Sequence, residues 1–600
     1  MEAGLAGGQG SGIGGRGLWL VLGVVLLLRL PFLNQAILGD DHIYLSEAAH
    51  ALIDPLHPDN TGYVFQGREV DLRGQPHPPL DAWVLAGLIS LAGDVKEIPF
   101  HAAYIVFSLI AAAAMWSLAR RFSPRPLWAA LLFFAVPAFV VNGNSLETDL
   151  PFLAFWMAAV ALFCGGRLTL SALAMALAAM TAYQAVFLTP ILAVYVWLYH
   201  RRDRARWPAI LAPPVTIAAW QIFERLSTGA APAAAVTGYF SIYQTLEAKL
   251  SNALALAIHS WFIVFPALVP GALVLAWRKR REPETLFLLA WIAIFFAGAV
   301  AVFFAGSARY LLPIAAPVAL LASRLRPRWL ALGFAAQMAL GMGLAVVNYR
   351  HWDAYRRFAQ SLAVPAGHRL WIDGEWGLRH YLEAQGGLPL RQTERLRAGD
   401  TVVSSALSHS VDIHGPHSPF APPLEIRPAI PLRLIGLETH SGYSSASLSH
   451  LWPFGISAGV IDRVSASIMA ERHPALSWLP MNAPEAKDQI VTGIYDLESG
   501  SYRWMSRSAV VALKSPPAAA PLMVSFTIPE SAPARRVTLL LDGREVAAQT
   551  YSAPGAYTLE SPLVRGAGAE ALLEIRIDRS FSAPPDRREL GIVLTAVGFR

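Results

Sequence analysis

The stretch LWLVLGVVLLLRLPFLNQAIL, residues 18–38, decides the fold class, because it is an apolar run long enough to cross a lipid bilayer. It is too long for the core of a signal peptide, and no small-residue cleavage site follows it. We interpret it as an uncleaved first membrane span. GDDHIYLSEAAHAL, residues 39–52, comes next and places Asp40 beside Asp41. This acidic pair indicates a solvated loop, a helix cap or the polar end of an enzyme site.

The composition favours a protein that crosses the membrane many times. Hydrophobic residues make up 54% of the 600 residues and charged residues only 15%, too few to cover a soluble protein of this length. The net charge of +6 lies in short clusters between apolar runs, so we expect no nucleic-acid partner. Cys164 is the only cysteine, which excludes an intramolecular disulfide and a Cys/His zinc motif.

The apolar runs, of about 20 residues each, predict a bundle of transmembrane helices. We expect eleven spans, at about 18–38, 99–119, 127–142, 149–165, 168–182, 184–199, 208–224, 256–277, 285–305, 307–323 and 329–347. The basic loops all fall on one face of this topology, which the positive-inside rule makes cytoplasmic. The residues after the last span then lie outside. With no disulfide expected, this favours a bacterial inner membrane with a periplasmic C-terminal region.

The chain divides into four predicted regions. Residues 1–17 are Gly-rich and expected to be disordered, and residues 18–349 form the transmembrane domain with a large external loop at 39–98. We expect residues 350–485 to form a small periplasmic α/β module, because the pattern of RLWIDGEWGLRHYLEAQGG indicates a strand and then a helix that ends at glycine. Residues 486–600 alternate in hydrophobicity and contain the hairpin signal LDGRE, which predicts a jelly-roll-like β-sandwich.

An aromatic stretch in the predicted module, HSGYSSASLSHLWPFGIS, spans residues 440–457. It could pack over a cavity on the membrane side or onto its own domain. We favour the second interpretation.

Polar residues gather in the external loops of the predicted topology. They are Asp40, Asp41 and His42 after the first span, Arg73 and His77 in RGQPHPPLDAW, Glu147 and Asp149 in NSLETDLP, and Arg309 and Tyr310 in GSARYLLP. Charges at one membrane depth are costly in lipid, so we expect them to face a polar cavity. Each has a structural alternative: a helix cap for the Asp pair, an N-terminal charge pair for Glu147 and Asp149, and snorkelling for Arg309.

GDDHIYLSEAAHAL, HPPL, ETDLPFLAF and ARYLLPIAAPVALL, in this order, resemble motifs of the GT-C superfamily of polytopic membrane glycosyltransferases. The nearest branch resembles the bacterial relatives of protein O-mannosyltransferases and lipid A aminoarabinose transferases, over about residues 18–347. The resemblance implies a polyprenyl-phosphate sugar donor and a glycan, lipid or protein hydroxyl acceptor, with membrane lipids around the enzyme. Transfer would take place on the outer face of the membrane.

The resemblance also implies roles for the polar residues. One of Asp40 and Asp41 would be the base that activates the acceptor; we favour Asp40, which matches the first acidic position of the motif. Direct displacement by one base would invert the anomeric centre. Arg309 would bind the donor phosphate.

The remaining polar residues take supporting roles. We expect Arg73, His77 and Tyr310 to help at the donor phosphate, although His77 stands where aminoarabinose transferases have a lysine. Glu147, Asp149 and His42 would position the acceptor or a metal. No cofactor is required by this interpretation; a divalent cation held by Asp41, Glu147 and Asp149 stays open.

Two other functions remain open. A transporter or flippase of lipid-linked sugars also places charges within the membrane. A polysaccharide polymerase or ligase would share the donor and the outer loops. Cleavage of the glycosidic bond of the donor separates a transferase from a transporter.

Overall fold

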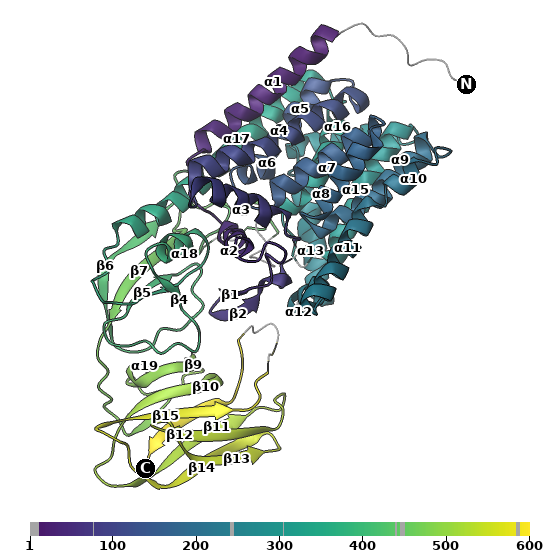
Figure 1. Ribbon diagram of the computed structural model, residues 1–600. Helices are drawn as coiled ribbons and strands as arrows, with labels where there is room; N and C mark the ends of the chain where they lie inside the picture. The colour runs from purple at the N-terminus through teal and green to yellow at the C-terminus, as the bar shows by residue number, and fades with distance from the viewer. Residues whose placement is uncertain are drawn as a thin grey trace.

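A helical part followed by a β-rich part makes up the chain, as the computed structural model shows (Figure 1). It describes residues 11–75, 77–240, 245–303, 305–438, 441–443, 451–581, 583 and 588–600. The β-rich part lies at the end of the molecule away from the N-terminus. The predicted order, with a membrane-type helical region before a C-terminal β-rich region, is confirmed.

The helical part contains most of the helices of the chain. In chain order they are α1 (Ser11–Arg29), η1 (Leu30–Phe32), α2 (Asp41–Ala51), η2 (Leu72–Gly74), α3 (Leu80–Ala92), α4 (Glu97–Phe122), α5 (Pro126–Phe134), α6 (Pro137–Asn142), α7 (Asp149–Cys164), α8 (Leu168–Ala179), η3 (Tyr183–Phe187), α9 (Leu188–Tyr199), α10 (Arg206–Ala209), α11 (Ala212–Thr228), α12 (Pro232–Phe240), α13 (Leu246–Ser260), η5 (Pro266–Leu268), α14 (Val269–Arg278), α15 (Pro283–Val302), η6 (Arg309–Leu311), α16 (Leu312–Ala322) and α17 (Pro327–Ser361).

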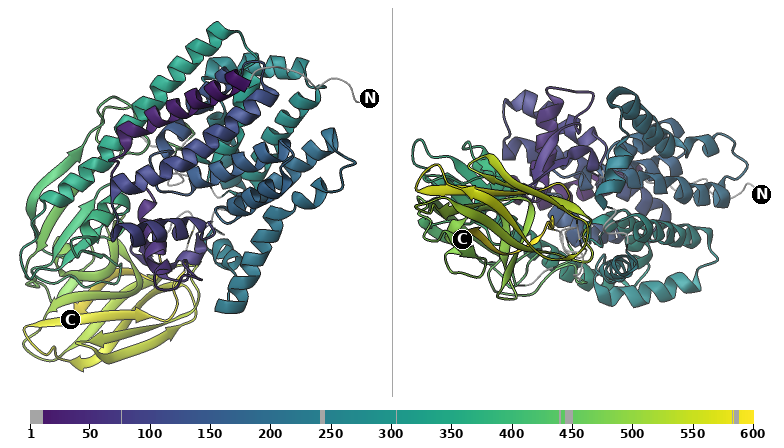
Figure 2. Two further views of the ribbon diagram at one scale, coloured as in Figure 1. Left: turned by 45° about the horizontal axis from the view of Figure 1, so that its top comes forward. Right: turned by 90° about the horizontal axis from the view of Figure 1, so that it is seen from below.

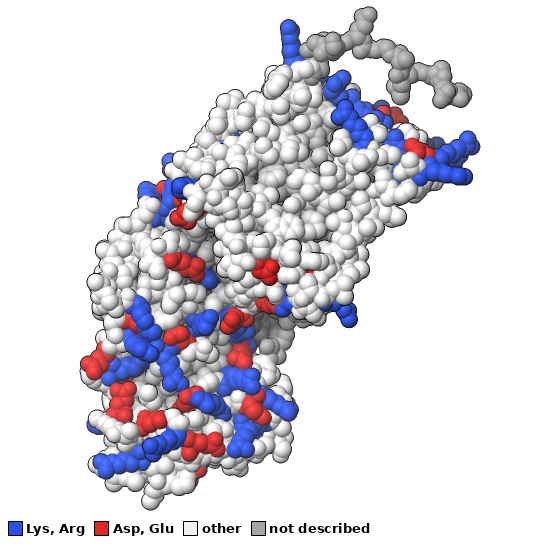
Figure 3. Space-filling view, in the orientation of Figure 1, with Lys and Arg blue, Asp and Glu red and all other residues white. Residues whose placement is uncertain are grey.

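Several of these helices have the length and apolarity of membrane spans. Within the described residues they are Gly15–Phe32, Glu97–Phe122, Pro283–Val302 and Pro327–Ser361, and six further apolar helices are shorter. The chain is therefore a multi-pass membrane protein, while the count of eleven spans stays a prediction. Figure 3 shows Lys and Arg gathered at the end of the helical part where α9 and α10 lie, away from the β-rich part.

Prolines break two of the predicted spans. The run 256–277 divides into α13 and α14, with Pro266 and Pro270 at the starts of η5 and α14. The run 127–142 divides into α5 and α6 at Pro137. Proline lacks an amide hydrogen and clashes with the preceding turn, so it begins a helix more readily than it continues one.

The disorder expected for residues 1–17 is wrong for residues 11–17, which belong to α1; residues 1–10 lie outside the described residues. Once residues 18–29 are helical, each added residue gains a hydrogen bond without a new nucleation step. The helix therefore extends through this glycine-rich segment.

Helix α17 joins the two parts of the molecule (Figure 2). Its 35 residues extend for about 52 Å. The second half of α17 packs against the first β-sheet of the soluble region through Tyr355 and Phe358. The Tyr355 hydroxyl also donates to Asp462 Oδ2 at 2.7 Å. The predicted domain boundary at residues 349–350 thus falls inside one continuous helix.

The first soluble sheet has five strands in the order β4-β3-β5-β7-β6. Strand β3 pairs in parallel with β4 and β5, and β7 pairs antiparallel with β5 and β6. The elements are β3 (Leu370–Asp373), α18 (Trp376–Glu383), β4 (Leu388–Pro389), β5 (Thr401–Ser405), β6 (His417–Ile426) and β7 (Asp462–Met469).

The C-terminal sheet is antiparallel and encloses its own apolar core. Its main path runs β13-β12-β15-β10-β16-β11-β14, with β8 on β16 and β9 on β10. The elements are β8 (Trp478–Pro480), α19 (Ala486–Gln489), β9 (Ile490–Glu498), β10 (Tyr502–Lys514), β11 (Ala520–Ile528), β12 (Arg535–Leu541), β13 (Arg544–Tyr551), β14 (Gly555–Val564), β15 (Glu570–Ile577) and β16 (Val593–Phe599). The jelly-roll description and the domain limits stay predictions.

The loop after α1 joins the helical part to α18. It contains the hairpin of β1 (Gly62–Phe65) and β2 (Arg68–Asp71). The backbone N–H of Gln66, at the turn of this hairpin, donates to Glu375 Oε1 at 2.7 Å, and Arg379 of α18 donates to the Val64 carbonyl. The soluble region is therefore held against the loop that carries Asp40.

Candidate active site

The turn between α6 and α7, which carries Glu147, is fixed by Arg29 of α1. Arg29 donates to the Phe139 carbonyl at 2.7 Å and to the Val140 carbonyl at 2.9 Å. These carbonyls lie near the end of α6, where backbone acceptors lack partners within the helix. A Cβ at Gly143 would overlap the Arg29 guanidinium, so glycine permits this approach. The buried arginine of the first span thus sets the path of the Glu147 loop.

Asp40 lies at the N-cap position of α2 but does not use its side chain as a cap among the described residues. Its backbone N–H donates to Glu147 Oε1 at 3.2 Å. Gly39 has φ +46°, and a Cβ there would crowd the same glutamate oxygen. The Asp40 carboxylate, about 30% exposed, is left to face Arg309.

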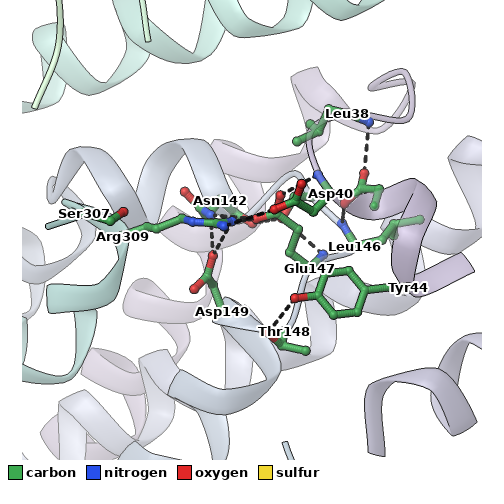
Figure 4. Close-up of polar contacts among 12 residues, drawn as sticks. Leu38, Asp40, Tyr44, Asn142, Leu146, Glu147, Thr148, Asp149, Ser307 and Arg309 are labelled. Carbon is green, nitrogen blue, oxygen red and sulfur yellow. Dashed lines mark hydrogen bonds and ion pairs between the residues drawn. The ribbon is translucent and has the colours of Figure 1, made fainter. Parts of the chain in front are cut away.

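Arg309 of η6 is the centre of the cluster (Figure 4). Its Nη1 pairs with Glu147 Oε2 and, at 3.2 Å, with Asp149 Oδ2, and its Nη2 lies 3.5 Å from Asp40 Oδ2. The Arg309 side chain is only 9% exposed, so it does not snorkel. The structure therefore brings together four residues that the sequence singled out from three separate loops.

Burial is the largest influence on the pKa values of Glu147 and Asp40. It raises the pKa of Glu147 to about 8, although the Arg309 guanidinium acts to lower it. Burial also raises the pKa of Asp40, again against the charge of Arg309. An acid with a raised pKa is a stronger proton acceptor once ionised, which suits a base.

A residue from the soluble region, Tyr443, completes the cluster. The hydroxyl of Tyr443 donates to Asn142 Oδ1, and Asn142 Nδ2 donates to Asp149 Oδ2 at 2.7 Å. The Tyr443 carbonyl accepts from Ser307 Oγ at 2.6 Å. The preferred interpretation, that the stretch 440–457 packs on its own domain, is therefore wrong for Tyr443. Residues 440 and 444–450 of that stretch lie outside the described residues.

Two cavities lie near this cluster. The smaller, of about 60 Å³, is lined by Asp40, Glu147 and Arg309 among others. The larger, of about 380 Å³, is mainly apolar, and its lining includes His77 and Tyr310. Arg309 and Tyr310 are neighbours in η6, so this short helix contributes one residue to each cavity.

Comparison with known proteins supports the resemblance seen in the sequence. Residues 76–219, which include His77, Glu147 and Asp149, match the family model described as dolichyl-phosphate-mannose-protein mannosyltransferase. The match covers about a quarter of the chain, so it shows similarity to this family of glycosyltransferases over these residues. The resemblance to GT-C glycosyltransferases that the motifs indicated is confirmed.

Solved structures show weaker likenesses to the chain. The structure of ArnT from Cupriavidus metallidurans in the apo state has 14% identity and a TM-score of 0.42, covering 65% of this chain and 92% of that chain. Arabinofuranosyltransferase AftD from Mycobacteria has 12% identity and a TM-score of 0.39, covering 97% of this chain and 60% of that chain. Scores this low say nothing about residues or substrates. No curated protein sequence matches the chain.

Asp41 holds the backbone of two loops at the site. Its Oδ2 accepts from the Leu38 N–H at 3.1 Å, and its Oδ1 accepts from the Leu146 N–H at 2.8 Å. The side chain is fully buried, and burial raises the pKa of Asp41 well above its ordinary value. Asp41 therefore links the loop that carries Asp40 to the loop that carries Glu147, and both of its carboxylate oxygens accept from backbone amides.

His77 lies beside the cluster as an uncharged group. Its Nδ1 is 3.2 Å from Thr148 Oγ1, and its ring meets the Tyr44 ring edge-on. Burial lowers the pKa of His77 to about 4, so the imidazole is neutral at pH 7 and can offer a hydrogen bond but no charge.

The structure does not bring two of the predicted residues to the cluster. His42 pairs with Glu383 Oε2 of α18 at 3.0 Å and packs against His380. Arg73 pairs with Asp71 Oδ2 at 2.6 Å. On a helix such as α2, adjacent residues point in different directions, so His42 leaves the face that Asp41 occupies.

The residues do not fit the divalent cation that the sequence left open. Among the described residues, no group of three or more His, Cys, Asp and Glu side chains is arranged to hold a metal ion. The Arg309 guanidinium occupies the position between Glu147 and Asp149, and Asp41 faces backbone amides. The cluster is neutralised by arginine.

Trp376 also lines the smaller cavity, and sequence reasoning missed it. It begins α18 with φ +60°, an uncommon backbone conformation for a bulky residue. No local sequence signal marks it, since its place at the site depends on how the soluble region docks.

Proposed function

We propose that the chain transfers a glycosyl group from a polyprenyl-phosphate donor to a hydroxyl acceptor, with Asp40 as the base and with inversion at the anomeric carbon. The observation that carries this proposal is the 3.5 Å separation of Asp40 Oδ2 and Arg309 Nη2, both in the lining of the smaller cavity, while the next residue, Tyr310, lines the larger one. Asp40 lines only the smaller cavity and Tyr310 only the larger, which assigns the acceptor to one side and the donor to the other.

The larger cavity suits an isoprenoid phosphate. Apolar residues such as Phe187 and Val302 line it, while His77 and Tyr310 border it next to Arg309. The Arg309 Nε is buried and has no hydrogen-bond partner within the described part of the chain, so one donor of the guanidinium is unused. A phosphate oxygen would supply the missing acceptor.

The protonation of Glu147 supports phosphate binding. With a pKa raised to about 8, Glu147 is mostly protonated at pH 7, so Arg309 faces fewer negative charges and retains attraction for a phosphate. As the glycosidic bond breaks, negative charge develops on the phosphate beside the guanidinium, which stabilises it. Asp40 takes the proton of the acceptor hydroxyl as the new bond forms.

The topology supports transfer at the extracytoplasmic face of a bacterial inner membrane. The basic end of the helical part lies away from the β-rich part (Figure 3). By the positive-inside rule, this end is cytoplasmic and the soluble region is periplasmic.

The test follows the fate of a labelled donor. Membranes that contain the full chain are incubated with polyprenyl-phosphate mannose carrying a labelled sugar, the first choice because the matching family is described by dolichyl-phosphate mannose. Polyprenyl-phosphate glucose and a pentose donor follow. We expect label to leave the isoprenoid in the wild type and to stay on it in Asp40→Asn. Asp94→Asn, at an exposed acid of the same loop, is the matched control.

Two results would overturn the proposal. Full transfer by Asp40→Asn would show that Asp40 is not the base. Movement of every donor across the membrane with its glycosidic bond intact would indicate a transporter.

A further inference from the structure

The smaller cavity has an aromatic wall that the proposed reaction does not use. Its charged residues, Asp40, Glu147 and Arg309, all come from the helical part. Facing them are Trp352 of α17, Trp376 of α18 and Tyr443 of the soluble region. The Trp352 and Trp376 rings meet edge-on with centroids 6.1 Å apart. One side of the cavity is therefore aromatic and the other is charged.

The backbone of Trp376 is held in a strained conformation from both sides. A tryptophan at φ +60° is energetically costly and persists only where the surroundings impose it. On one side, Glu375 accepts from the Gln66 N–H, and its own N–H donates to Ser408 Oγ at 3.0 Å. On the other side, Gly377 packs so closely on the Ile37 carbonyl that a Cβ would overlap it.

This strain places the indole at the candidate base. Trp376 and Asp40 line the same small cavity, and the Trp376 side chain is only half-buried. Trp352, by contrast, is buried, and its indole N–H donates to Asn348 Oδ1 at 2.8 Å. Trp376 is therefore the ring of the wall best placed to meet an arriving molecule.

The charge of the cavity selects against anions. Asp40 and Glu147 line it with one guanidinium, and that guanidinium also pairs with Asp149. Although Glu147 is mostly protonated at pH 7, Asp40 and Asp149 still face the single guanidinium, so an anionic acceptor would meet two other carboxyl groups for one cation in a poorly solvated space. A neutral hydroxyl compound brings hydrogen bonds without that repulsion.

The size of the cavity limits what enters it. An engineered cavity of about 150 Å³ holds a benzene molecule, whereas this one has about 60 Å³. A hydroxymethyl group fits, whereas a whole sugar ring must stay at the mouth, against Trp376. The C–H face of a sugar ring packs well on the electron-rich face of an indole.

We propose that Trp376 determines acceptor specificity, and that the acceptor is an uncharged saccharide that presents a primary hydroxyl to Asp40. This inference rests on the proposed function, since it assigns the acceptor of the same site. It makes the soluble region part of the active site.

The test measures binding without the donor. The full chain in lipid nanodiscs is mixed with the methyl glycosides of glucose, mannose and galactose, and contact is measured by saturation-transfer NMR. The 6-deoxy and 6-phosphate forms of each glycoside are the matched probes. We expect at least one neutral glycoside to bind with its C6 hydrogens in closest contact, and both modified forms to bind roughly tenfold more weakly.

Variants of Trp376 test whether this side chain of the aromatic wall contacts the glycoside. Trp376→Ala should weaken glycoside binding roughly tenfold, and Trp376→Phe should retain part of it. Trp376→Gly suits the positive φ, so loss of binding in a protein that still unfolds cooperatively cannot come from backbone strain. Trp329→Ala, at an exposed tryptophan of α17 remote from the cavity lining, is the control.

Three results would overturn the inference: no neutral glycoside binds, a 6-phosphate binds as well as its parent, or Trp376→Ala binds as the wild type does. None of them depends on donor cleavage. If glycosides fail to bind while Asp40-dependent cleavage is present, only the acceptor assignment fails. If glycosides bind but no donor is cleaved, the proposed function fails.

Discussion

Asp40 and Arg309 are separated by 269 residues in the chain, yet Asp40 Oδ2 lies 3.5 Å from Arg309 Nη2. The first external loop and the loop before α16 therefore share one polar site. Glu147 links them, because it accepts from the Asp40 backbone and pairs with the Arg309 side chain. The site depends on this guanidinium for both charge balance and geometry.

Replacing Arg309 by methionine should destabilise the protein strongly. The change leaves the Asp149 side chain, 12% exposed, without its cation and removes the hydrogen-bond donor that faces Glu147, at a cost of about 3 kcal/mol or more. Arg309→Lys keeps a charge but not the planar fork, so it should fold better and still lose most activity. Unfolding midpoints in detergent measure the effect. Arg357→Met, at a side chain that is 68% exposed, is the control and should change stability by under about 0.5 kcal/mol.

Asp40 and Asp41 should respond differently to substitution. Asp41→Ala leaves the buried N–H groups of Leu38 and Leu146 without acceptors, which should cost about 2 kcal/mol or more of folding stability. Asp40→Asn should leave stability nearly unchanged and abolish transfer. Denaturant unfolding and donor cleavage are measured on both variants. A stable, inactive Asp41 variant would reverse the assignment of the base.

The pairing of the four charged residues could be predicted from sequence, because each follows or precedes an apolar run on the same face. The contribution of Trp376 and Tyr443 could not. Both come from the soluble region, where no hydrophobic period or charge rule links a residue to the membrane site. The break between α13 and α14 could also be predicted from the sequence, because it contains Pro266 and Pro270.

Raising the pH through about 8 should weaken donor binding. Ionisation of Glu147 adds a negative charge beside Arg309, which then competes with the donor phosphate, so the donor KM should rise above this pH. Asp40 and Asp149 are the other acidic side chains that face this guanidinium. Glu147→Gln mimics the protonated acid and should flatten the KM profile. A profile that is the same in Glu147→Gln and the wild type would exclude Glu147 as its cause.

Ionisation of Glu147 should also lower the stability of the folded protein as the pH rises. The folded pKa of Glu147, about 8, lies above the ordinary 4.5, so the folded state binds the proton more tightly. Its contribution is fully present below about pH 4.5 and is lost as the pH rises through about 8. Thermal unfolding at about pH 6 and pH 9 should show a smaller fall for Glu147→Gln than for the wild type.

Gly377→Ala should separate the soluble region from the loop that carries Asp40. The added Cβ would overlap the Ile37 carbonyl, which is backbone and cannot rotate away, so either α18 or the loop must move. We expect a loss of about 1–3 kcal/mol in stability and a larger relative loss of transfer, since displacement of this loop moves the base away from Arg309. Gly87→Ala is the matched control in α3, where a Cβ meets no atom within 4 Å, and it should be neutral or slightly stabilising. Hydrogen exchange at residues 36–40 reports the displacement directly. Unchanged exchange and activity in Gly377→Ala would mean that the soluble region does not hold Asp40 in place.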